Sequence, residues 1–387
     1  MRPRLPGEGL MMVLLILLLP LAAVPDSYGD SWPTYHGGAS LQGAADVSLP
    51  DVPVLLWRYR AGDSVDLTPV SGGGRIFVVS GSRIAALDMD GKLLWSRVIQ
   101  APETTGGPLR PESFLAPAVY AKGAVLAGSR SGVLHALDAS TGQDRWRYSV
   151  GGPITGSPGP VRSDDGKISV IVIAQSDGTL HRVALDTGKR EWKSGRVNRC
   201  DGSAAVNNGV IAFGNCDAAL YAYDAVSGAR INRVDLRRDG QVYAGVAFSG
   251  DRVYAGDRSG RIYAVDVAGG SILWVNEDSD DEISSTPAVD KGNLVITSDN
   301  GSVLCLDPET GKRRWRTVVD GRPSSPVIAR NRIALSAGGT LYILDLLTGK
   351  TVWSREVSDS ITSPALVGGM ILVGTEEGTV VAFGEKD

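Results

Sequence analysis

Short apolar stretches separated by polar turns recur along most of the chain. One clear unit begins with the small, proline-containing segment SSTPAV (284–289) and passes through the polar turn DKGN into the alternating stretch LVITS (294–298). It continues with DNGSVLCLD (299–307) and ends in a stretch that contains a tryptophan. Alternating apolar residues bounded by Gly, Asn and Asp are typical of strands joined by tight hairpins. The pattern predicts four short antiparallel strands in each unit.

The last of these strands follows a recurring phrase in which Asp and Gly precede Trp at nearly fixed offsets. LDPETGKRRW (306–315) matches LDASTGQDRW (137–146) almost position for position. Further copies are LDMDGKLLW (87–95), LDTGKREW (185–192), VDVAGGSILW (265–274), LDLLTGKTVW (344–353) and YDAVSGARIN (223–232). The copies are 38 to 51 residues apart, which is typical of the blades of a β-propeller.

The two ends of the chain hold complementary parts of one further unit. Residues 363–384 repeat the first three strands, but the chain ends before a fourth. VLLWRYRAG (54–62) has the pattern of a fourth strand, and no unit precedes it. We therefore predict an all-β fold over residues 54–387, an eight-bladed β-propeller of four-stranded antiparallel blades. The N-terminal strand would complete the last blade and so remove an exposed sheet edge.

The regular tryptophans allow two interpretations. One is an aromatic binding site. The other is structural: Gly permits the turn, Asp accepts backbone hydrogen bonds within it, and the indole covers the gap between neighbouring blades. Recurrence once per unit favours the structural role for Trp57, Trp95, Trp146, Trp192, Trp274, Trp315 and Trp353. Asn232 occupies the one position of the eight that lacks tryptophan, which predicts a weaker contact between two blades.

The N-terminal segment has the pattern of a targeting signal. Arg2 and Arg4 precede an apolar run at 10–24, which is too short and too interrupted by proline for a comfortable membrane span. We predict a signal peptide over 1–29, with cleavage after Ala23 as a rival, and a leader segment over 30–53. No cysteine follows the signal to carry a lipid. A periplasmic or secreted protein without stable membrane insertion is expected; the alternative is an uncleaved N-terminal anchor.

Composition and charge exclude some functions. The 387 residues are 43% hydrophobic and include 49 glycines but only five phenylalanines, which favours many turns over a helical bundle. The formal net charge is −4, so the chain lacks the basic excess that neutralises phosphates. No nucleic-acid partner is expected.

The Asp, the Thr-Gly-Lys and the Trp of the repeat resemble the repeat of pyrroloquinoline-quinone (PQQ)-type propellers. The segment WPTYHGG (32–38) also resembles the leader that often precedes such propellers. The family includes quinoprotein alcohol dehydrogenases and outer-membrane protein assembly factors of the BamB type. In size and organisation the chain is closest to the latter. The resemblance covers nearly all of the chain after the N-terminal segment, and it implies the fold more strongly than any activity.

The resemblance implies two functions from different classes. A BamB-like protein is a non-catalytic scaffold with protein partners, among them envelope β-barrel assembly components, and would be a monomer within such a complex. The alternative is a PQQ-dependent dehydrogenase or another propeller that binds a small ligand. The dehydrogenases use PQQ with calcium, a carboxylate base and a disulfide between adjacent cysteines. No two cysteines are adjacent here, so we expect no catalytic residue, no metal and no cofactor.

The cysteines have different expected roles. Cys200 precedes a predicted first strand and Cys216 follows a second strand, so both are expected at the same rim of one blade. An oxidising compartment favours a disulfide between them, with a reactive thiol as the weaker alternative. Cys305 occupies a strand position that is alanine in other units, which predicts a buried free thiol.

Other candidate chemistry is sparse. His36, His135 and His181 are scattered without the spacing of metal ligands, and we interpret them as strand or turn residues. The acidic run EDSDDEI (277–283) lacks the spacing of an EF-hand. It is interpreted as a solvated loop, with a calcium site as the alternative.

A partner is expected at one face of the ring. The connections from a fourth strand to the next first strand share a face with the turns between second and third strands, and this face usually carries the binding site. Two such connections, at 99–117 and 237–245, supply the partner-binding candidates Arg110, Glu112, Phe114, Arg237, Arg238 and Tyr243. Arg and Tyr are frequent at binding hot spots; the alternative is ordinary surface loops. An exposed blade edge could also bind extended clients by β-addition.

Overall fold

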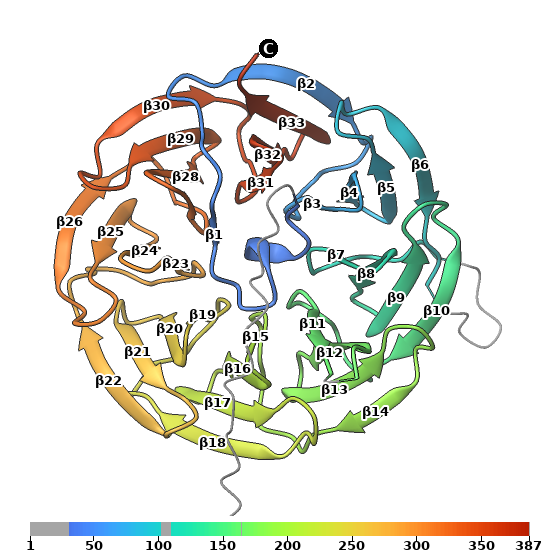
Figure 1. Cartoon of the computed structure of the whole chain (residues 1–387), viewed down its shortest axis with the longest axis horizontal. Coiled ribbons are helices and arrows are strands. Elements are labelled where there is room, and N and C mark those ends of the chain that lie inside the picture. Colours follow the sequence, from blue (N-terminus) through green and yellow to red (C-terminus); the bar gives the residue numbers. More distant parts are fainter. Residues whose placement is uncertain (1–30, 102–109, 164, 387) are drawn as a thin grey trace, which may run out of the picture.

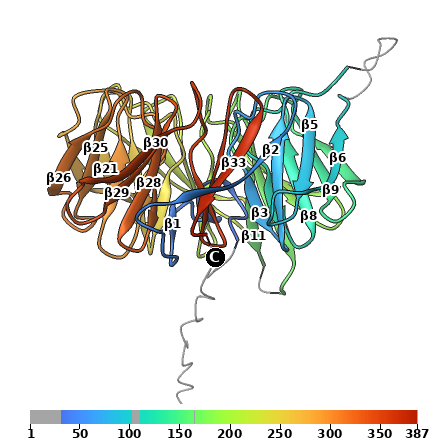
Figure 2. The ribbon, with the colours of Figure 1, turned by 90° about the horizontal axis from the view of Figure 1, so that it is seen from above.

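Eight β-sheets surround a central axis in a computed structural model of the chain (Figure 1). The structure describes residues 31–101, 110–163 and 165–386. Seen from the side, the sheets stand next to one another as a thick ring (Figure 2). The predicted eight-bladed β-propeller is confirmed. The predicted signal peptide lies outside the described residues.

Blades 1 to 4 each take four consecutive strands, which run from the inside of the ring to the outside. Blade 1 consists of β3 (Val70–Gly72), β4 (Arg75–Ser80), β5 (Arg83–Leu87) and β6 (Leu93–Val98). Blade 2 consists of β7 (Val119–Ala121), β8 (Ala124–Gly128), β9 (Val133–Asp138) and β10 (Asp144–Ser149). Blade 3 consists of β11 (Gly159–Arg162), β12 (Ile168–Ala174), β13 (Thr179–Ala184) and β14 (Arg190–Lys193). Blade 4 consists of β15 (Ala205–Asn207), β16 (Val210–Gly214), β17 (Ala219–Asp224) and β18 (Arg230–Asp235).

Blades 5 to 7 repeat this order, and blade 8 joins the two ends of the chain. Blade 5 consists of β19 (Ala247–Ser249), β20 (Arg252–Gly256), β21 (Ile262–Asp266) and β22 (Ser271–Asn276). Blade 6 consists of β23 (Ala288–Val289), β24 (Leu294–Thr297), β25 (Ser302–Leu306) and β26 (Arg313–Val318). Blade 7 consists of β27 (Val327–Ala329), β28 (Arg332–Ala337), β29 (Thr340–Asp345) and β30 (Thr351–Glu356). Blade 8 consists of β31 (Ala365–Val367), β32 (Met370–Gly374), β33 (Thr379–Gly384) and the N-terminal β2 (Val54–Arg60).

The antiparallel pair of β2 and β33 closes the ring. Trp57 lies opposite Ala382, and Arg60 lies opposite Thr379. The N-terminal strand therefore completes the last blade, as predicted from the sequence.

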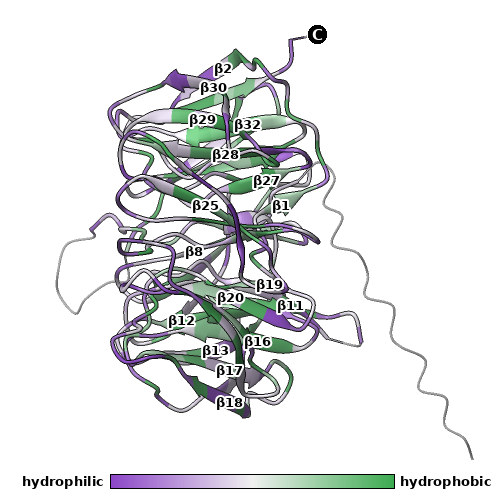
Figure 3. Cartoon of the chain, turned by 90° about the vertical axis from the view of Figure 1, so that its left-hand side faces the viewer, coloured by the Kyte–Doolittle hydropathy of each residue, from purple (hydrophilic) through white to green (hydrophobic). Residues whose placement is uncertain are grey.

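The second and third strands of the blades supply most of the core. In β4 and β5 the apolar side chains are almost completely buried, whereas the fourth strand β6 leaves Leu93 and Leu94 about half exposed. Figure 3 shows hydrophobic residues concentrated in the strands and hydrophilic residues in many of the loops. Burial on both faces explains why these middle strands are continuous apolar runs, while the outer strands alternate apolar and charged residues.

Each tryptophan of the repeat closes the contact between its own blade and the next. Trp57 donates its indole N–H to the carbonyl oxygen of Met89 in blade 1 at 3.1 Å. A Cβ on Gly91 would lie 2.5 Å from the same indole, so only glycine fits beneath the ring, and its φ of +77° also favours glycine. Equivalent indole bonds join Trp95 to Ala139, Trp146 to Leu185, Trp192 to Ala225, Trp274 to Pro308 and Trp315 to Leu346. The structural interpretation of these tryptophans agrees with this geometry.

The last tryptophan has a different neighbour. The ring of Trp353 packs against Phe383 at a centroid distance of 5.7 Å and an angle of 65°. In blades 1 to 4, 6 and 7 the indole of the preceding blade covers the turn between the third and fourth strands. In blade 8 those strands come from opposite ends of the chain, so no continuous turn joins them.

The leader segment crosses the centre of the ring, where its single 3₁₀ turn, η1 (Tyr35–Gly37), lies (Figure 1). Six first strands each donate a backbone N–H to a leader carbonyl at 2.7 to 2.9 Å. The donors are Ser71, Tyr120, Val206, Phe248, Val289 and Ile328. In blade 3 the corresponding residue is Pro160, which has no N–H to donate. The leader thus connects blades that are distant in sequence.

The leader also extends blade 7 with a fifth strand. β1 (Ala44–Ala45) pairs in parallel with β27, with Ala44 opposite Ile328. Trp32 is 1% exposed and belongs to the core shared by blades 1, 7 and 8. His36 is buried as well, with Nδ1 2.8 Å from the Leu41 carbonyl oxygen and Nε2 2.8 Å from that of Pro326. The predicted leader is therefore a structural part of the ring, a role that the repeat pattern did not reveal.

Candidate partner-binding rim and central cavity

Hydrogen bonds between neighbouring blades hold one face of the central opening. The Ser157 N–H donates to Ser203 Oγ at 2.9 Å, which joins blade 3 to blade 4. The Gly245 N–H donates to Thr286 Oγ1 at 3.0 Å, and the Thr286 N–H donates to Ser325 Oγ at 2.9 Å. All five residues lie just before a first strand. The small and hydroxyl residues of segments such as SSTPAV therefore join the blades at this face.

The leader closes the bottom of this opening. The Tyr35 hydroxyl lies 2.7 Å from Ser325 Oγ and donates to Thr286 Oγ1 at 3.3 Å. Its ring stacks on His36 with a centroid distance of 5.4 Å. Bonds at the hydroxyl and stacking along the ring fix the position of Tyr35.

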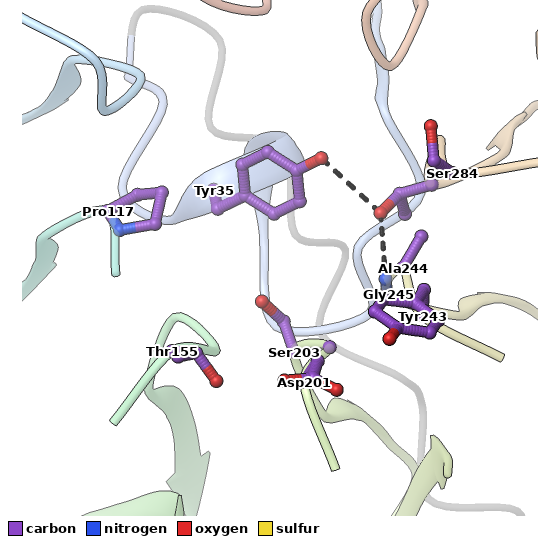
Figure 4. A pocket seen from close by; sticks show the side chains of 11 residues that line it. Tyr35, Pro117, Thr155, Asp201, Ser203, Tyr243, Ala244, Gly245 and Ser284 are labelled. Carbon is purple, nitrogen blue, oxygen red and sulfur yellow. Dashed lines mark hydrogen bonds between the residues drawn. The ribbon is translucent and has the colours of Figure 1, made fainter. Parts of the chain in front are cut away.

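A cavity of about 160 Å³ lies next to Tyr35 (Figure 4). Its walls come from the connections that precede the first strands of blades 2 to 6. The lining residues are Tyr35, Pro117, Thr155, Asp201, Gly202, Ser203, Tyr243, Ala244, Gly245, Ser284 and Thr286. Of the candidates from the sequence, only Tyr243 contributes to this wall.

Asp201 is the carboxylate of the cavity, and cationic and amide groups already surround it. The Arg199 guanidinium donates to Asp201 Oδ2 at 2.9 Å, and Gln175 donates to Oδ1 at 2.5 Å. The side chain of Asp201 is 12% exposed. Arg199 offsets the negative charge, so the wall has little net charge at this point.

The rim next to the cavity carries Tyr243 and several arginines. The Arg258 guanidinium lies 4.8 Å from the centre of the Tyr243 ring and pairs with Glu282 at 2.8 Å. Arg237 and Arg238 are exposed on the same connection as Tyr243, and Arg237 pairs with Glu277. Here the structure agrees with the predicted placement of Arg237, Arg238 and Tyr243 at one rim.

The acidic run 277–283 makes ion pairs both with this rim and with the outer strand β26. Asp278 pairs with Arg313 at 3.7 Å, and Asp280 pairs with Arg316 at 2.7 Å. These carboxylates face guanidinium groups, and the part of the chain that the structure describes holds no group of three His, Cys, Asp or Glu side chains arranged to bind a metal. The loop interpretation therefore fits better than the calcium site.

The other predicted rim segment is only partly at the surface. Arg110 is exposed, but Glu112 is 4% exposed and Phe114 is 7% exposed. Glu112 Oε2 accepts a hydrogen bond from Ser131 at 2.6 Å and lies 3.3 Å from His135 Nε2. The proposed partner-binding roles of Glu112 and Phe114 were wrong. Both side chains stabilise the entry to blade 2, and residues 102–109 of this connection lie outside the described residues.

Burial and hydrogen bonding compete at this carboxylate. Burial alone would raise the pKa of Glu112, but hydrogen bonds from Ser131, from the Ser113 backbone and from His135 lower it. Burial lowers the pKa of His135, and its bond to Glu112 partly offsets that effect. No sequence pattern marks this pair, because its members are 23 residues apart and lie in different parts of the fold.

The predicted disulfide is absent, although its members are close. Cys200 and Cys216 lie at the same rim, where the Cys216 N–H donates to the Arg199 carbonyl oxygen at 3.1 Å. Both thiols are free. The Cys200 thiol instead donates to the Gly214 carbonyl oxygen at 3.1 Å, and the Cys216 thiol lies 3.8 Å from Asp201 Oδ2. The sequence predicted correctly that Cys200 and Cys216 lie at the same rim, but it did not predict the directions in which their side chains point.

Cys305 is a buried free thiol, as predicted. It lies opposite Trp315 on β26, just as Ala86 lies opposite Trp95 and Ala136 lies opposite Trp146. Burial raises its pKa to about 12.

Comparison with known proteins decides the family. The family described as outer membrane protein assembly factor BamB matches residues 54–231, 217–279 and 258–387, which span all eight blades. The chain belongs to the BamB family. BamB of Yersinia pestis is 28% identical over 349 residues, covering 82% of this chain and 84% of the relative.

The solved structures confirm the shared fold. BamB from Moraxella catarrhalis superposes with a TM-score of 0.70 at 19% identity and covers 86% of this chain and all of the relative. The quinohemoprotein alcohol dehydrogenase from Comamonas testosteroni gives a TM-score of 0.72 at 15% identity, covering 92% of this chain and 81% of the relative. Because an enzyme superposes as well as a BamB protein, the fold alone does not separate the two functions.

Among the residues that the structure describes, no helix is long and apolar enough to span a membrane.

Proposed function

We propose that the chain is an exported, non-catalytic scaffold that binds protein partners during outer-membrane protein assembly. The match to the BamB family over residues 54–387 carries this proposal. It includes the strand that closes the ring, so it concerns the whole propeller rather than a few blades. A cleaved signal peptide over 1–29 would place the propeller in the periplasm.

The rim formed by Arg237, Arg238 and Tyr243 is the proposed contact surface. Tyr243 offers an aromatic face beside Arg258, and Arg238 is exposed, with its backbone carbonyl accepting a hydrogen bond from Arg261. Tyr and Arg supply large contact areas and several hydrogen-bond donors, which are frequent features of binding hot spots. The proposed partners are envelope β-barrel assembly components, and the chain would act as a monomer within their complex.

Several features favour a scaffold over a PQQ-dependent dehydrogenase. The cavity of about 160 Å³ is smaller than the roughly 300 Å³ at which typical cofactor pockets begin. Its carboxylate, Asp201, is paired with Arg199 rather than open to a cation, and the cysteines at 200, 216 and 305 are not adjacent. The residues present do not fit PQQ with calcium, so the proposed scaffold has no cofactor.

Affinity purification from a native envelope extract, with an absorption spectrum of the same sample, tests the proposal. A scaffold should co-purify with β-barrel assembly components, and its absorption should come from protein alone. A variant that combines Arg238→Glu with Tyr243→Ala should lose these components, while Asp251→Lys on the opposite face should retain them. A quinone absorption band together with calcium-dependent dye reduction would overturn the proposal.

A further inference from the structure

Exposed apolar side chains gather on the outer surface of blades 7, 8 and 1. Twelve large apolar side chains are exposed among the described residues, and eight of them belong to these blades or to the segment that leads into β2. The eight are Val52, Val54, Leu55, Leu93, Leu94, Val98, Leu347 and Val352. The outer strands β30, β2 and β6 follow one another along the circumference of the ring (Figure 1). Apolar side chains concentrated on one side of a soluble protein indicate a binding surface.

Three arginines lie within this surface without a carboxylate partner. Arg58 and Arg60 are exposed on β2, and Arg355 is exposed on β30. None of the three belongs to an ion pair between described residues, and β2 and β30 together hold a single carboxylate, Glu356. Arg332 of blade 7, by contrast, pairs with two carboxylates. The surface is therefore basic as well as apolar, although the whole chain has a net charge of −4.

The register of β2 brings these side chains together at the contact between blades 7 and 8. Leu55 and Arg58 lie opposite alternate residues of β33, so they share one face of the sheet. Leu55 lies opposite Phe383, whose ring packs against Trp353 of blade 7. The Arg355 guanidinium lies 5.6 Å from the centre of the same Phe383 ring. This face of β2 therefore points toward blade 7 and forms one surface with β30.

Trp353 completes this surface with an amphipathic ring. The six other tryptophans of the repeat each donate their indole N–H to a backbone carbonyl of the next blade. No described residue accepts such a bond from Trp353, which is partly exposed, because blade 8 has no continuous turn at this position. An indole with an apolar body and an available N–H is favoured where water meets a membrane.

This combination of side chains fits the surface of a membrane. Arginines pair with phosphate groups, and aliphatic and indole side chains enter the boundary between the headgroups and the acyl chains. The surface spans the outer strands of three blades, so it suits a flat and extended partner. Figure 1 shows β2 on the opposite side of the ring from β18, which the connection with Arg238 follows. We propose that the outer surface of blades 7, 8 and 1 binds a bilayer containing anionic phospholipids, independently of any protein partner at the rim.

Co-sedimentation of the purified protein with lipid vesicles tests this surface. The protein should bind vesicles of equal parts phosphatidylcholine and phosphatidylglycerol more tightly than vesicles of phosphatidylcholine alone, and added salt should weaken the binding. A variant that combines Arg58→Glu with Arg60→Glu should bind the anionic vesicles about tenfold more weakly or worse, because two attractive charges become repulsive. Brominated acyl chains should quench part of the tryptophan fluorescence, and Trp353→Phe should lose most of that quenching.

A variant that combines Lys193→Glu with Arg230→Glu is the matched control. Both residues are exposed on outer strands, β14 and β18, outside the proposed surface, and the change in net charge is the same. This variant should bind anionic vesicles nearly as well as the original protein. The proposal is overturned if the protein binds neither kind of vesicle, which would leave the surface to a protein partner. It is equally overturned if the protein binds both kinds equally, or if the two double variants bind the anionic vesicles equally well.

Discussion

Asn232 donates its side-chain amide to the carbonyl oxygen of Ala268, across the contact between blades 4 and 5. This is the bond that the indoles make elsewhere, for example from Trp315 to Leu346. The glycine that lies beneath the ring is also retained, as Gly270 with φ +79°. Asparagine therefore keeps the hydrogen bond of the repeat but not the buried area of the indole.

Replacing Asn232 by Trp should stabilise the ring. The substitution restores the indole over Gly270, whose missing side chain leaves room for it, and should raise the free energy of unfolding by about 0.5–2 kcal/mol. Asn232→Ala removes the bond to Ala268 and should lower it by about 1 kcal/mol. Denaturant unfolding of both variants measures the effect. If Asn232→Trp is no more stable than the original protein, the contact between blades 4 and 5 is not weaker than the other contacts between blades.

Gly311→Ala should destabilise the protein more than Gly369→Ala. Both glycines have positive φ, +70° and +78°, so alanine costs about 1–2 kcal/mol at either position. At Gly311 a Cβ would also lie 2.6 Å from the Trp274 ring, whereas nothing lies within 4 Å at Gly369. Moving the indole should add about 1–3 kcal/mol. Equal losses in thermal or chemical unfolding would contradict the role of glycine beneath the indole.

Acidification should destabilise the fold through His181. Its ring is buried, and its Nδ1 lies 2.7 Å from the Tyr148 hydroxyl. Burial, followed by the charges of Lys193 and Arg190, lowers the pKa of His181 to about 4. The unfolded chain, with a histidine pKa near 6.5, binds the proton first, so stability present above about pH 6.5 is lost as the pH falls toward 4.

The free energy of unfolding, measured across this range, should fall less steeply in His181→Asn than in the original protein. His36 and His135 also have lowered pKa values because of burial, so part of the pH dependence should remain in the variant. A His181 pKa at or above 6.5 by NMR titration would contradict this assignment.

The cysteines should react in a fixed order without prior reduction. Cys216 is partly exposed and should be alkylated first, whereas Cys200 and Cys305 are buried and should react only after unfolding. Burial raises the pKa of all three thiols, which slows their reaction further. A peptide pair linked through Cys200 and Cys216 in non-reducing mass spectrometry would contradict the free thiols.

The sequence predicted the ring well because each blade repeats the same physical solution. Tryptophan and glycine recur at fixed offsets, and six of the indoles pack on the glycine of the next blade, as Trp274 does on Gly311. The two-part last blade was predictable because Trp57 carries the same pattern without a unit before it. The fold was therefore encoded in periodic positions.

The site was less predictable because its contacts are not periodic. Glu112 looked like a surface residue in a polar loop, and only the structure places His135 and Ser131 around it. Tyr35 lies in a leader outside the repeat, yet it bonds Thr286 and Ser325, more than 250 residues away. Such pairings depend on ring closure, which brings distant segments together.

A photo-crosslinking residue introduced at Arg238 tests the central claim most directly. Arg238 is exposed at the proposed contact rim, and Asp251 is exposed in the turn between β19 and β20 on the opposite face. Irradiation of intact cells should join position 238, but not position 251, to β-barrel assembly components identified by mass spectrometry. Equal crosslinking at both positions, or crosslinks to these components at position 251 alone, would contradict a scaffold that binds its partners through this rim.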